Sequence, residues 1–340
     1  MLKLNIAVIG LGHWGKNYIR LLNEHPYINN IYGCDVLNKN IESIALKYPR
    51  AQYFNKYRDI IKTNNIDGVI IATHTSTHYQ IGIEFLKNGI HTLIEKPLCM
   101  RSEEGEKMIE LAKKKQCVLM VGHTFLYNNA VMKMKEIVTT KSFGEIFYIT
   151  ARRTHLGLIR QDVSVHWDLA PHDISIINYL MEKLPQAVQG TAVKLISQNR
   201  YDVAFINLYY SNNVLANINV SWLDSNKTRE VAVIGKFKKV IFNDLSTEEP
   251  LRIYEKGVEL VQEQLYGSFG EFKYLIRDGK IESPKIKMIE PLKQQVDDFI
   301  NSILKNRKPR CDGEIGLGVV KVLEKVDESI KKDGKIVSLS

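Results

Sequence analysis

The segment from residue 90 to residue 97 ends in charged residues that can take part in catalysis. Apolar and β-branched residues predict a short buried strand, which is followed by Glu95-Lys96-Pro97. Pro97 has no N–H group to donate, so it ends the strand and leaves Lys96 at its carboxyl end. Open α/β sheets bind ligands at that end, where a partly desolvated ammonium can be catalytic. The alternative is a lysine that simply reaches solvent.

A second segment brings a carboxylate and an imidazole together. Asp168 and His172 are four residues apart at the start of an apolar helical pattern that runs to Leu180, which places both on one face of a helix. Pro171 is compatible with that helix only in its first turn. With a lysine, these two groups could take the proton of a hydroxyl during hydride transfer. The alternative is a capping aspartate and a hydrogen-bonded interior histidine.

Both segments need a redox partner, and the N-terminus carries a dinucleotide-binding pattern. Residues 4–9 predict a strand, and a G-x-G-x-x-G motif separates it from a helical pattern. The first glycine allows a tight turn, the second lets the backbone approach a pyrophosphate, and the third lets helix and strand pack. The pyrophosphate would bind at the helix N-terminus. The predicted contacts are Gly10, Gly12, His13, Trp14 and Gly15.

The next strand ends in an acid that predicts which dinucleotide binds. Asp35 follows the strand predicted over residues 30–34 and lies 20 residues after Gly15. A carboxylate there accepts hydrogen bonds from the ribose 2′-hydroxyl and repels a 2′-phosphate. Residues 36–38 supply no arginine for such a phosphate. The sequence therefore predicts NAD rather than NADP as the cofactor.

Strand and helix patterns alternate as far as Val121, which predicts a doubly wound parallel sheet of the Rossmann type. The segment 73–78 follows the strand predicted over residues 68–72 directly, so it should line the cofactor cleft. For His74 and His78, ordinary loop or cap roles are the alternative. The further predicted cofactor contacts are Thr73, Thr75, His78, Glu95 and Lys96.

The pattern changes after Gly122. Six successive segments between residues 187 and 255 read as strands with turn-like junctions, and 266–283 reads as an irregular loop. Helices are predicted over 291–304 and 313–330. We expect an α/β protein with a Rossmann domain over 1–122 and an α+β domain over 123–340. The second domain should hold a large, mainly antiparallel open sheet whose apolar face predicts a homo-oligomer, a dimer or tetramer.

Composition limits the classes of partner. Of the 340 residues, 44% are hydrophobic and 25% charged, as in soluble globular proteins. No apolar run approaches the ~20 residues of a membrane span, and the four cysteines lack metal-ligand spacing, so we expect a cytoplasmic protein with reduced thiols. The net charge of +9 permits an anionic partner. Without a nucleic-acid-binding module, a phosphate-bearing small molecule is the preferred partner.

Together these motifs resemble the Gfo/Idh/MocA oxidoreductase family. The resemblance rests on the G-x-G-x-x-G start, the Glu95-Lys96-Pro97 strand end and the pair Asp168 and His172 before an antiparallel sheet. It spans nearly the whole chain. It implies a tightly held nicotinamide cofactor and a sugar or cyclitol substrate. The catalytic residues that it implies are Lys96, Asp168 and His172. Separately, we expect no metal site.

Within that family the chain is similar to the nucleotide-sugar branch. The similarity lies in the strings HTFLYN at 123–128 and WDLAPHDIS at 167–175. It implies oxidation of the C3 hydroxyl of a UDP-linked N-acetylhexosamine, with Arg152, Arg153 and Arg160 available for a diphosphate. Members acting on free sugars often carry an arginine within 125–129, which is absent here. The implied substrate contacts are Lys96, Tyr127, Asn128, Arg152, Arg153, Asp168 and His172.

Three other functions stay open at the level of sequence. One is an NADPH-dependent 3-ketoreductase of a dTDP-deoxysugar, against which Asp35 argues. Another is an inositol or free-sugar dehydrogenase. A third is a non-enzymatic regulator that senses the dinucleotide and has lost catalysis. Such a regulator would not need to keep Lys96, Asp168 and His172 together.

Overall fold

The computed structural model describes residues 2–63, 65–157, 159–260, 274–277 and 279–339. The chain divides into two compact units. The first contains residues 1–127 and 289–324, and the second contains residues 128–288 and 325–340. Each unit is therefore built from two separate segments of the chain. In the described part of the chain, no helix is long and apolar enough to cross a membrane.

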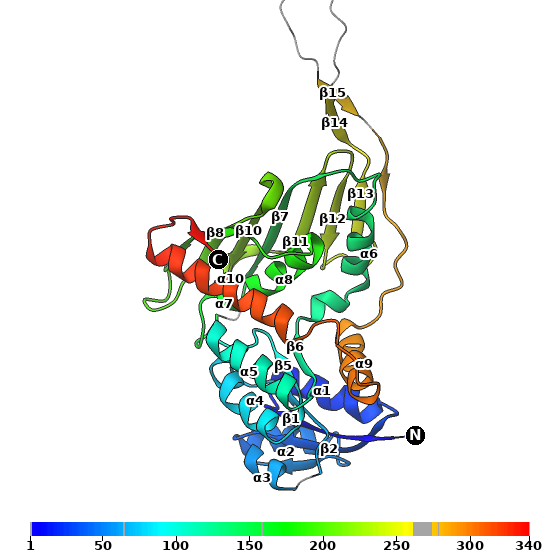
Figure 1. Cartoon of the computed structure of the whole chain (residues 1–340), viewed down its shortest axis with the longest axis vertical. Coiled ribbons are helices and arrows are strands. Elements are labelled where there is room, and N and C mark those ends of the chain that lie inside the picture. The colour runs from blue at the N-terminus through cyan, green and yellow to red at the C-terminus, as the bar shows by residue number, and fades with distance from the viewer. Residues whose placement is uncertain (1, 64, 158, 261–273, 278, 340) are drawn as a thin grey trace, which may run out of the picture. The chain divides into compact units, whose positions relative to one another are not determined.

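The first unit is built on a six-stranded parallel sheet (Figure 1). Its strands are β1 (Leu4–Ile9), β2 (Ile28–Cys34), β3 (Gln52–Phe54), β4 (Gly68–Ile71), β5 (His91–Glu95) and β6 (Leu119–Gly122). The spatial order β3-β2-β1-β4-β5-β6 reverses direction between β1 and β4, and ligands of doubly wound sheets bind at such a switch point. The predicted Rossmann sheet is confirmed.

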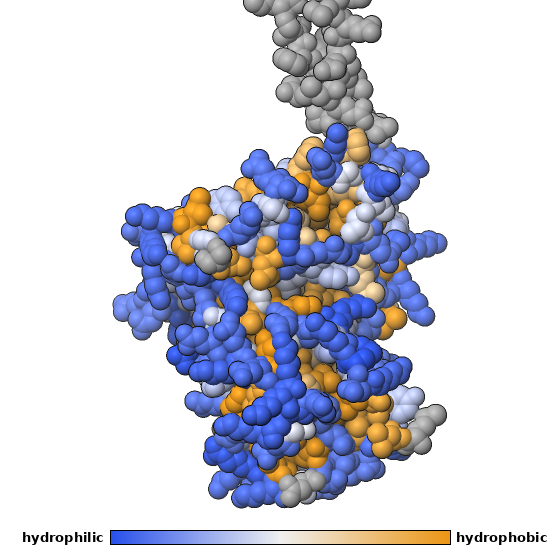
Figure 2. Space-filling view, viewed as in Figure 1, coloured by the Kyte–Doolittle hydropathy of each residue, from blue (hydrophilic) through white to orange (hydrophobic). Residues whose placement is uncertain are grey.

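Helices surround that sheet because each has one apolar face. In α1, for example, Tyr18, Ile19 and Leu22 are buried while polar residues face outward. Figure 2 shows hydrophilic side chains over much of the visible surface of α5 and α10. The helices of this unit are α1 (His13–Glu24), α2 (Asn38–Ala45), α3 (Tyr57–Lys62), η1 (Thr75–Thr77), α4 (His78–Lys87), α5 (Ser102–Lys114), η2 (Thr124–Tyr127), α9 (Pro291–Leu304) and the first part of α10 (Gly313–Lys331).

The second unit is built on a nine-stranded sheet with β7 near its centre. The order is β16-β13-β12-β11-β7-β10-β9-β8-β17. Among the described strand pairs of this second sheet, only β7–β10 is parallel. The predicted large, mainly antiparallel sheet is confirmed. Its strands are β7 (Ile146–Leu156), β8 (Ala187–Val193), β9 (Val203–Tyr209), β10 (Leu215–Ser221), β11 (Leu223–Gly235), β12 (Lys239–Asn243), β13 (Leu251–Tyr254), β16 (Ile281–Glu282) and β17 (Val337–Ser338).

Helices cover one face of this sheet. They are α6 (Asn129–Val138), α7 (Val165–Asp168), α8 (Ala170–Met181) and the end of α10, with a short turn η3 (Ser211–Asn213) between β9 and β10. Ile206 and Ile218 of the covered face are fully buried. Side chains alternate across a strand, so neighbouring residues of β7 face opposite sides. The helix-covered face therefore holds the core of the second unit.

Two local expectations were wrong. Asp168 and His172 do not share one helix, because α7 ends at Asp168 and α8 begins at Ala170. Pro171 has no N–H group to continue the hydrogen-bond ladder, which explains the break. Within the predicted loop 266–283, the described residues instead form β15 (Tyr274–Arg277), which pairs with β14 (Gly257–Leu260), and β16. Residues 266–273 and 278 lie outside the described residues.

Candidate active site

The glycine turn between β1 and α1 has the geometry that a dinucleotide requires. Gly10 adopts a positive φ of 88°. A Cβ on Gly15 would lie 1.8 Å from the carbonyl oxygen of Gly10, so only glycine lets helix and strand approach this closely. Beside Gly12 a Cβ would meet nothing within 4 Å. The first turn of α1 holds no acidic residue and its N-cap no side-chain hydrogen bond, so its N–H groups suit a phosphate.

Asp35 stands beside this turn, at the carboxyl end of β2. The backbone N–H groups of Leu11 and Leu37 each donate to one of its oxygens at 2.8 Å, and the Asn40 side chain donates at 3.0 Å. Its exposed fraction is 8%. A carboxylate offers about four lone-pair positions and these three donors occupy three of them, so acceptor capacity remains for a ribose hydroxyl. The residues present therefore fit a nicotinamide dinucleotide.

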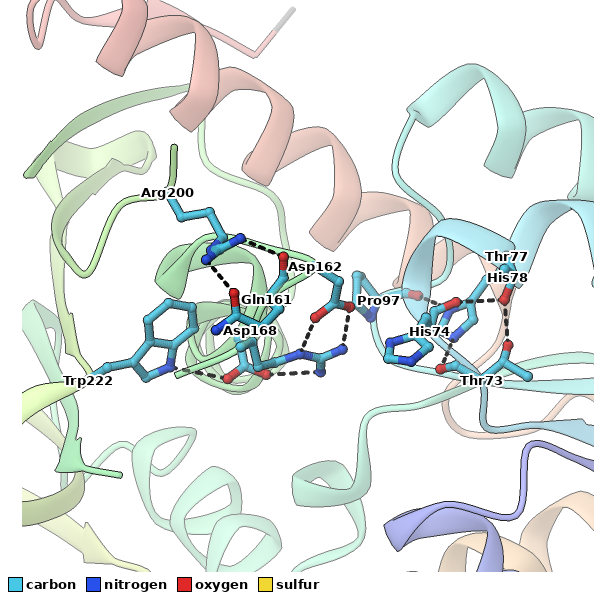
Figure 3. A network of polar contacts seen from close by, with 11 residues as sticks. Thr73, His74, Thr77, His78, Pro97, Gln161, Asp162, Asp168, Arg200 and Trp222 are labelled. Atoms are coloured by element: carbon cyan, nitrogen blue, oxygen red, sulfur yellow. Dashed lines mark hydrogen bonds and ion pairs between the residues drawn. The ribbon is translucent and has the colours of Figure 1, made fainter. Parts of the chain in front are cut away.

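The loop after β4 is tied to the loop after β5 by His78. Its Nδ1 lies 2.8 Å from the carbonyl oxygen of Pro97 and its Nε2 lies 3.2 Å from that of Thr73 (Figure 3). The hydroxyls of Thr73 and Thr77 are 2.7 Å apart, and Thr77 also donates to the carbonyl of His74. His78 is buried. Its ring therefore positions the two loops, whereas a direct cofactor contact by His78 stays a prediction.

Glu95 forms the centre of a buried hydrogen-bond network. The Tyr18 hydroxyl donates to Oε1 of Glu95 at 2.6 Å, and the Lys96 backbone N–H donates to Oε2 at 3.1 Å. The Gln295 side-chain amide donates to the Tyr18 oxygen at 2.7 Å, and the Thr124 hydroxyl donates to Gln295 at 2.8 Å. Burial raises the pKa of Glu95. This network fixes the backbone from which the half-buried Lys96 side chain extends.

Asp168 is held from two sides within the second unit. The indole Nε1 of Trp222 donates to one carboxylate oxygen at 3.3 Å, and Arg160 contacts the other at 3.3 Å (Figure 3). Arg160 also forms a bidentate ion pair with Asp162. His172 lies in the first turn of α8 and is half-buried. The structure thus gives Asp168 a fixed orientation.

The short helix α7 that carries Asp168 is fastened to α10. Asp327 accepts hydrogen bonds from Nε2 of His166 at 2.7 Å and from Nε1 of Trp167 at 2.8 Å. Burial opposes ionisation of Asp327, but these two donors outweigh it and hold its pKa below the usual range. The carboxylate therefore stabilises the position of α7.

Two arginines predicted to contact substrate have other partners. Arg153 forms a bidentate pair with Asp173 at 2.8 and 3.0 Å, and the Arg153 side chain is only 4% exposed. Burial raises the pKa of Asp173, and the guanidinium opposes that rise. Arg152 lies on the opposite face of β7 and pairs with Asp224 at 2.6 Å. We therefore leave both arginines out of the proposed substrate site.

Tyr127 and Asn128 also have structural partners. The Tyr127 hydroxyl donates to Asp298 at 2.7 Å, and the guanidinium of Arg310 lies 5.3 Å from the centre of its ring. Asn128 caps α6 by accepting the N–H of Ala130. Both residues are buried. These contacts explain both residues without a substrate.

Several residues of these networks were missed from the sequence. Their partners lie far along the chain, as the sequence separation of 277 between Tyr18 and Gln295 illustrates. No local pattern signals such a pairing, and an aromatic or amide residue on a helix reads simply as part of its core or surface. The missed residues are Tyr18, Thr124, Trp222, Gln295 and Asp327.

Within the described residues, no group of three or more potential metal ligands occurs.

Two long parts of the chain match known domains of one family. Residues 4–123 match the oxidoreductase family with an NAD-binding Rossmann fold, Gfo/Idh/MocA, and residues 131–240 match its C-terminal domain. The chain belongs to the Gfo/Idh/MocA oxidoreductase family. The family resemblance predicted from the motifs is confirmed, and so is an NAD-binding domain.

Relatives of this Gfo/Idh/MocA protein include sugar-nucleotide enzymes. The UDP-N-acetylglucosamine 3-dehydrogenase of Acidithiobacillus ferrooxidans is 26% identical over 323 residues, which are 94% of this chain and 95% of the relative. Its solved structure superposes with a TM-score of 0.81 at 23% identity, covering 98% of this chain and 99% of that one.

Two further solved structures share the fold and contain ligands. The WlbA dehydrogenase from Bordetella pertussis, in complex with NADH and UDP-GlcNAcA, has a TM-score of 0.79 at 19% identity over 99% of each chain. GenD2 from gentamicin A biosynthesis, in complex with NAD, has a TM-score of 0.84 at 18% identity over 100% of this chain and 97% of that one. At such identities these structures show a common fold.

Proposed function

We propose that this oxidoreductase is an NAD-dependent dehydrogenase that oxidises the C3 hydroxyl of a UDP-linked N-acetylhexosamine, for use in 3-amino-sugar biosynthesis. The observation that carries the proposal is the similarity to a UDP-N-acetylglucosamine 3-dehydrogenase along 94% of the chain. Both of the segments on which the sequence predicts catalysis lie within the two domain matches, residues 4–123 and 131–240. The preference for the UDP-linked sugar follows from this likeness.

The preference for NAD over NADP is proposed from Asp35. Its carboxylate is fixed by two backbone N–H groups and is almost fully buried. A 2′-phosphate beside it would place like charges together in a poorly hydrated position, which is unfavourable. Residues 1–122 would then hold the cofactor and carry Lys96, and residues 123–340 would supply the other substrate contacts and the oligomer interface.

The catalytic roles follow from the chemistry of three residues. When bound, the nicotinamide accepts the hydride from the sugar carbon. Lys96 would stabilise the negative charge that develops on the sugar oxygen as its proton leaves. His172 is the preferred base, since the ordinary pKa of histidine lies near neutral pH. Asp168 would orient the imidazole or bind a sugar hydroxyl, and Lys96 is the alternative base.

Arg160 is the proposed contact to the diphosphate. Its planar guanidinium suits bidentate binding of phosphate oxygens. Its present partners are Asp162 and Asp168, so it already lies beside a residue proposed for catalysis within the same unit. A diphosphate that binds Arg160 would replace Asp168 as the partner of this guanidinium. The Asp168 carboxylate would then be available to the sugar.

The test is oxidation of candidate sugars by the purified protein with NAD. UDP-N-acetylglucosamine, UDP-glucose, dTDP-glucose and myo-inositol are compared, with hydroxylamine present to trap a ketone product. We expect the absorbance of reduced nicotinamide to rise with UDP-N-acetylglucosamine, and mass spectrometry to show the oxime that hydroxylamine forms with the 3-keto sugar. Turnover of myo-inositol alone, or NAD binding without turnover of any sugar, would contradict the proposal.

We also propose that the protein is a homo-oligomer, a dimer or tetramer. Tyr148, Val193, Phe205 and Leu215 are apolar residues exposed on the sheet face opposite the helices of the second unit. Exposed apolar patches of this kind favour association. Light scattering at micromolar concentration should give a multiple of the chain mass. A single species with the mass of one chain would contradict this.

A further inference from the structure

His123, immediately after β6, is an imidazole that the proposed function has not used. Its exposed fraction is 0%. Neither Nδ1 nor Nε2 has a hydrogen-bond partner among the described residues. Buried polar groups without partners are rare in native proteins, and leaving one unsatisfied is unfavourable. Such a residue calls for a partner that becomes available in the working protein.

The sheet register places His123 beside Lys96. In the parallel pair β5–β6, Glu95 lies opposite Gly122. The next residue on each strand is therefore Lys96 on one side and His123 on the other, both at the carboxyl end of the sheet. Neighbouring parallel strands are about 4.8 Å apart, so the two side chains start from adjacent positions. This end is also the one at which doubly wound sheets bind ligands.

The imidazole is neutral. Burial lowers the pKa of His123 to about 3, and the Lys96 ammonium adds to that effect. A neutral imidazole has one nitrogen that donates and one that accepts. It can therefore take a hydrogen bond from an ammonium and give one to an oxygen atom, without adding a positive charge beside Lys96.

Two other histidines of the first unit, the buried His78 and the half-buried His91, do not share this state. His78 contacts two carbonyl oxygens, and Nδ1 of His91 accepts the backbone N–H of Val118 at 2.9 Å. Burial lowers the pKa of His91 as well, so burial alone does not distinguish the two residues. What distinguishes His123 is the pair of unused ring nitrogens next to Lys96.

We propose that His123 is a positioning residue for Lys96: in the cofactor-bound protein one ring nitrogen accepts a hydrogen bond from the Lys96 ammonium and fixes it for catalysis. The ammonium carries three donors on a flexible four-carbon stem, so it can serve the imidazole together with its other contacts. This inference rests on the proposed catalytic role of Lys96. It assigns no proton transfer to His123.

The first test measures Lys96 directly and needs no substrate. The protein with NAD bound is trace-acetylated at a series of pH values, and peptide mass spectrometry gives the titration midpoint of Lys96. In His123→Phe the ammonium loses an acceptor that favours its charged form, so the midpoint should fall by about one pH unit. In His123→Gln, whose side-chain carbonyl can accept the same hydrogen bond, the midpoint should stay near that of the wild type.

His91→Phe is the matched control, because His91 is a half-buried histidine at the opposite end of β5. It should leave the Lys96 midpoint unchanged. Circular dichroism and NAD binding show which variants are folded, and His123→Leu replaces His123→Phe if the latter fails to fold. An unchanged Lys96 midpoint in a folded, NAD-binding apolar variant overturns the proposal, whatever sugar the protein oxidises.

The second test uses whichever sugar the substrate panel identifies. His123→Phe should lower kcat about tenfold to a hundredfold, as for the loss of a hydrogen bond to a charged group, with little change in KM. His123→Gln should recover most of that loss. Equal losses in the two variants would overturn the positioning role. Absence of turnover in the wild type would instead contradict the proposed function and leave the Lys96 titration to decide on His123.

Discussion

Two regions carry the candidate catalytic residues, the surroundings of Glu95 in the first unit and the helices α7 and α8 in the second. Each region is stabilised internally by a different kind of interaction. Around Glu95 in the first unit, the partners are neutral: a tyrosine hydroxyl, an amide of the backbone and a glutamine behind them. Around α7 and α8 in the second unit, ion pairs dominate, including Arg153–Asp173 and Arg160–Asp168. The first region should therefore respond mainly to lost hydrogen bonds, and the second to lost charges and to pH.

The largest effect is expected for catalysis, for which we propose one residue of each region. Lys96→Ala and His172→Ala should each lower the rate of NAD reduction by about 10²–10⁴, the usual effect of removing a positioned acid–base group. NAD affinity should change far less than the rate, since both variants keep the glycine turn for the pyrophosphate and Lys96 is only one of several predicted cofactor contacts. Single-turnover absorbance and calorimetry measure the two quantities. Lys87→Ala, at the exposed end of α4, is the control. Wild-type rates in both catalytic variants would contradict the assignment.

A large effect on stability is expected in the second unit. Arg153→Met leaves the Asp173 carboxylate buried without its partner, and the free energy of unfolding should fall by about 3–5 kcal/mol. Arg152→Met breaks a half-exposed ion pair one residue earlier and should cost about 0–1 kcal/mol. Urea unfolding measures both. Adding Asp173→Leu to Arg153→Met should restore much of the loss, because an apolar pair of similar volume needs no desolvated charge. Equal losses in the two single variants would contradict the contrast.

A smaller effect is expected for cofactor choice in the first unit. Asp35→Ala removes a charged hydrogen-bond acceptor, so NAD affinity should fall about tenfold to a hundredfold. NADP affinity should change far less, because the lost repulsion offsets the lost contacts. Calorimetric titration with each dinucleotide gives the ratio. If the unaltered protein binds NADP more tightly than NAD, the interpretation of Asp35 is wrong.

The smallest effects should separate the two regions by their pH dependence. The pKa of Asp327 is held low, so its contribution to stability is present above the unfolded pKa of about 3.9 and is lost as the pH falls through the folded value. The pKa of Glu95 is raised, so its effect has the opposite sign: stability rises as the pH falls through the folded pKa toward about 4.3.

Unfolding free energies measured between neutral pH and pH 3 test this difference. Relative to the wild type, Asp327→Asn should be less stable by about 1–2 kcal/mol at neutral pH, roughly one charge-assisted hydrogen bond, and the gap should close in acid. For Glu95→Gln the advantage of the wild type should grow as the pH falls. Parallel pH profiles for the two variants would show that the regions do not differ in this way.

The sequence predicted the elements well where the pattern is local. The motif glycines, the ends of α9 and the strand ending at Glu95 follow from residue types within a few positions. Pro171 signals that a helix begins just before it, which agrees with the start of α8 at Ala170. The same residue leaves Asp168 at the end of the preceding helix α7, which the four-residue spacing to His172 does not predict. The strand β15 was missed because residues 261–273 separate it from its partner β14 in the sequence, and its own residues, YLIR, show no alternating pattern.

Candidate site residues were predictable by type and place, and their partners were not. A lysine at a strand end can be recognised from sequence, whereas the Trp222 indole that holds Asp168 comes from a strand junction 54 residues away. Arg152 and Arg153 illustrate the limit most clearly. Their adjacent positions show that they face opposite sides of β7. Only the structure shows that Arg153 forms an ion pair with Asp173 and Arg152 with Asp224.

The return of residues 289–324 to the first unit has a practical consequence for engineering. A truncation after residue 122 would keep every motif that identifies the dinucleotide fold, yet it would delete Gln295 and expose the surface that α9 covers on α1. Such a fragment should be poorly soluble. The second unit is better regarded as an insertion in the Rossmann unit, so grafting a different substrate domain requires two junctions, near residues 128 and 288. A third junction, within α10 at residue 324, would be needed to exchange the C-terminal strand as well.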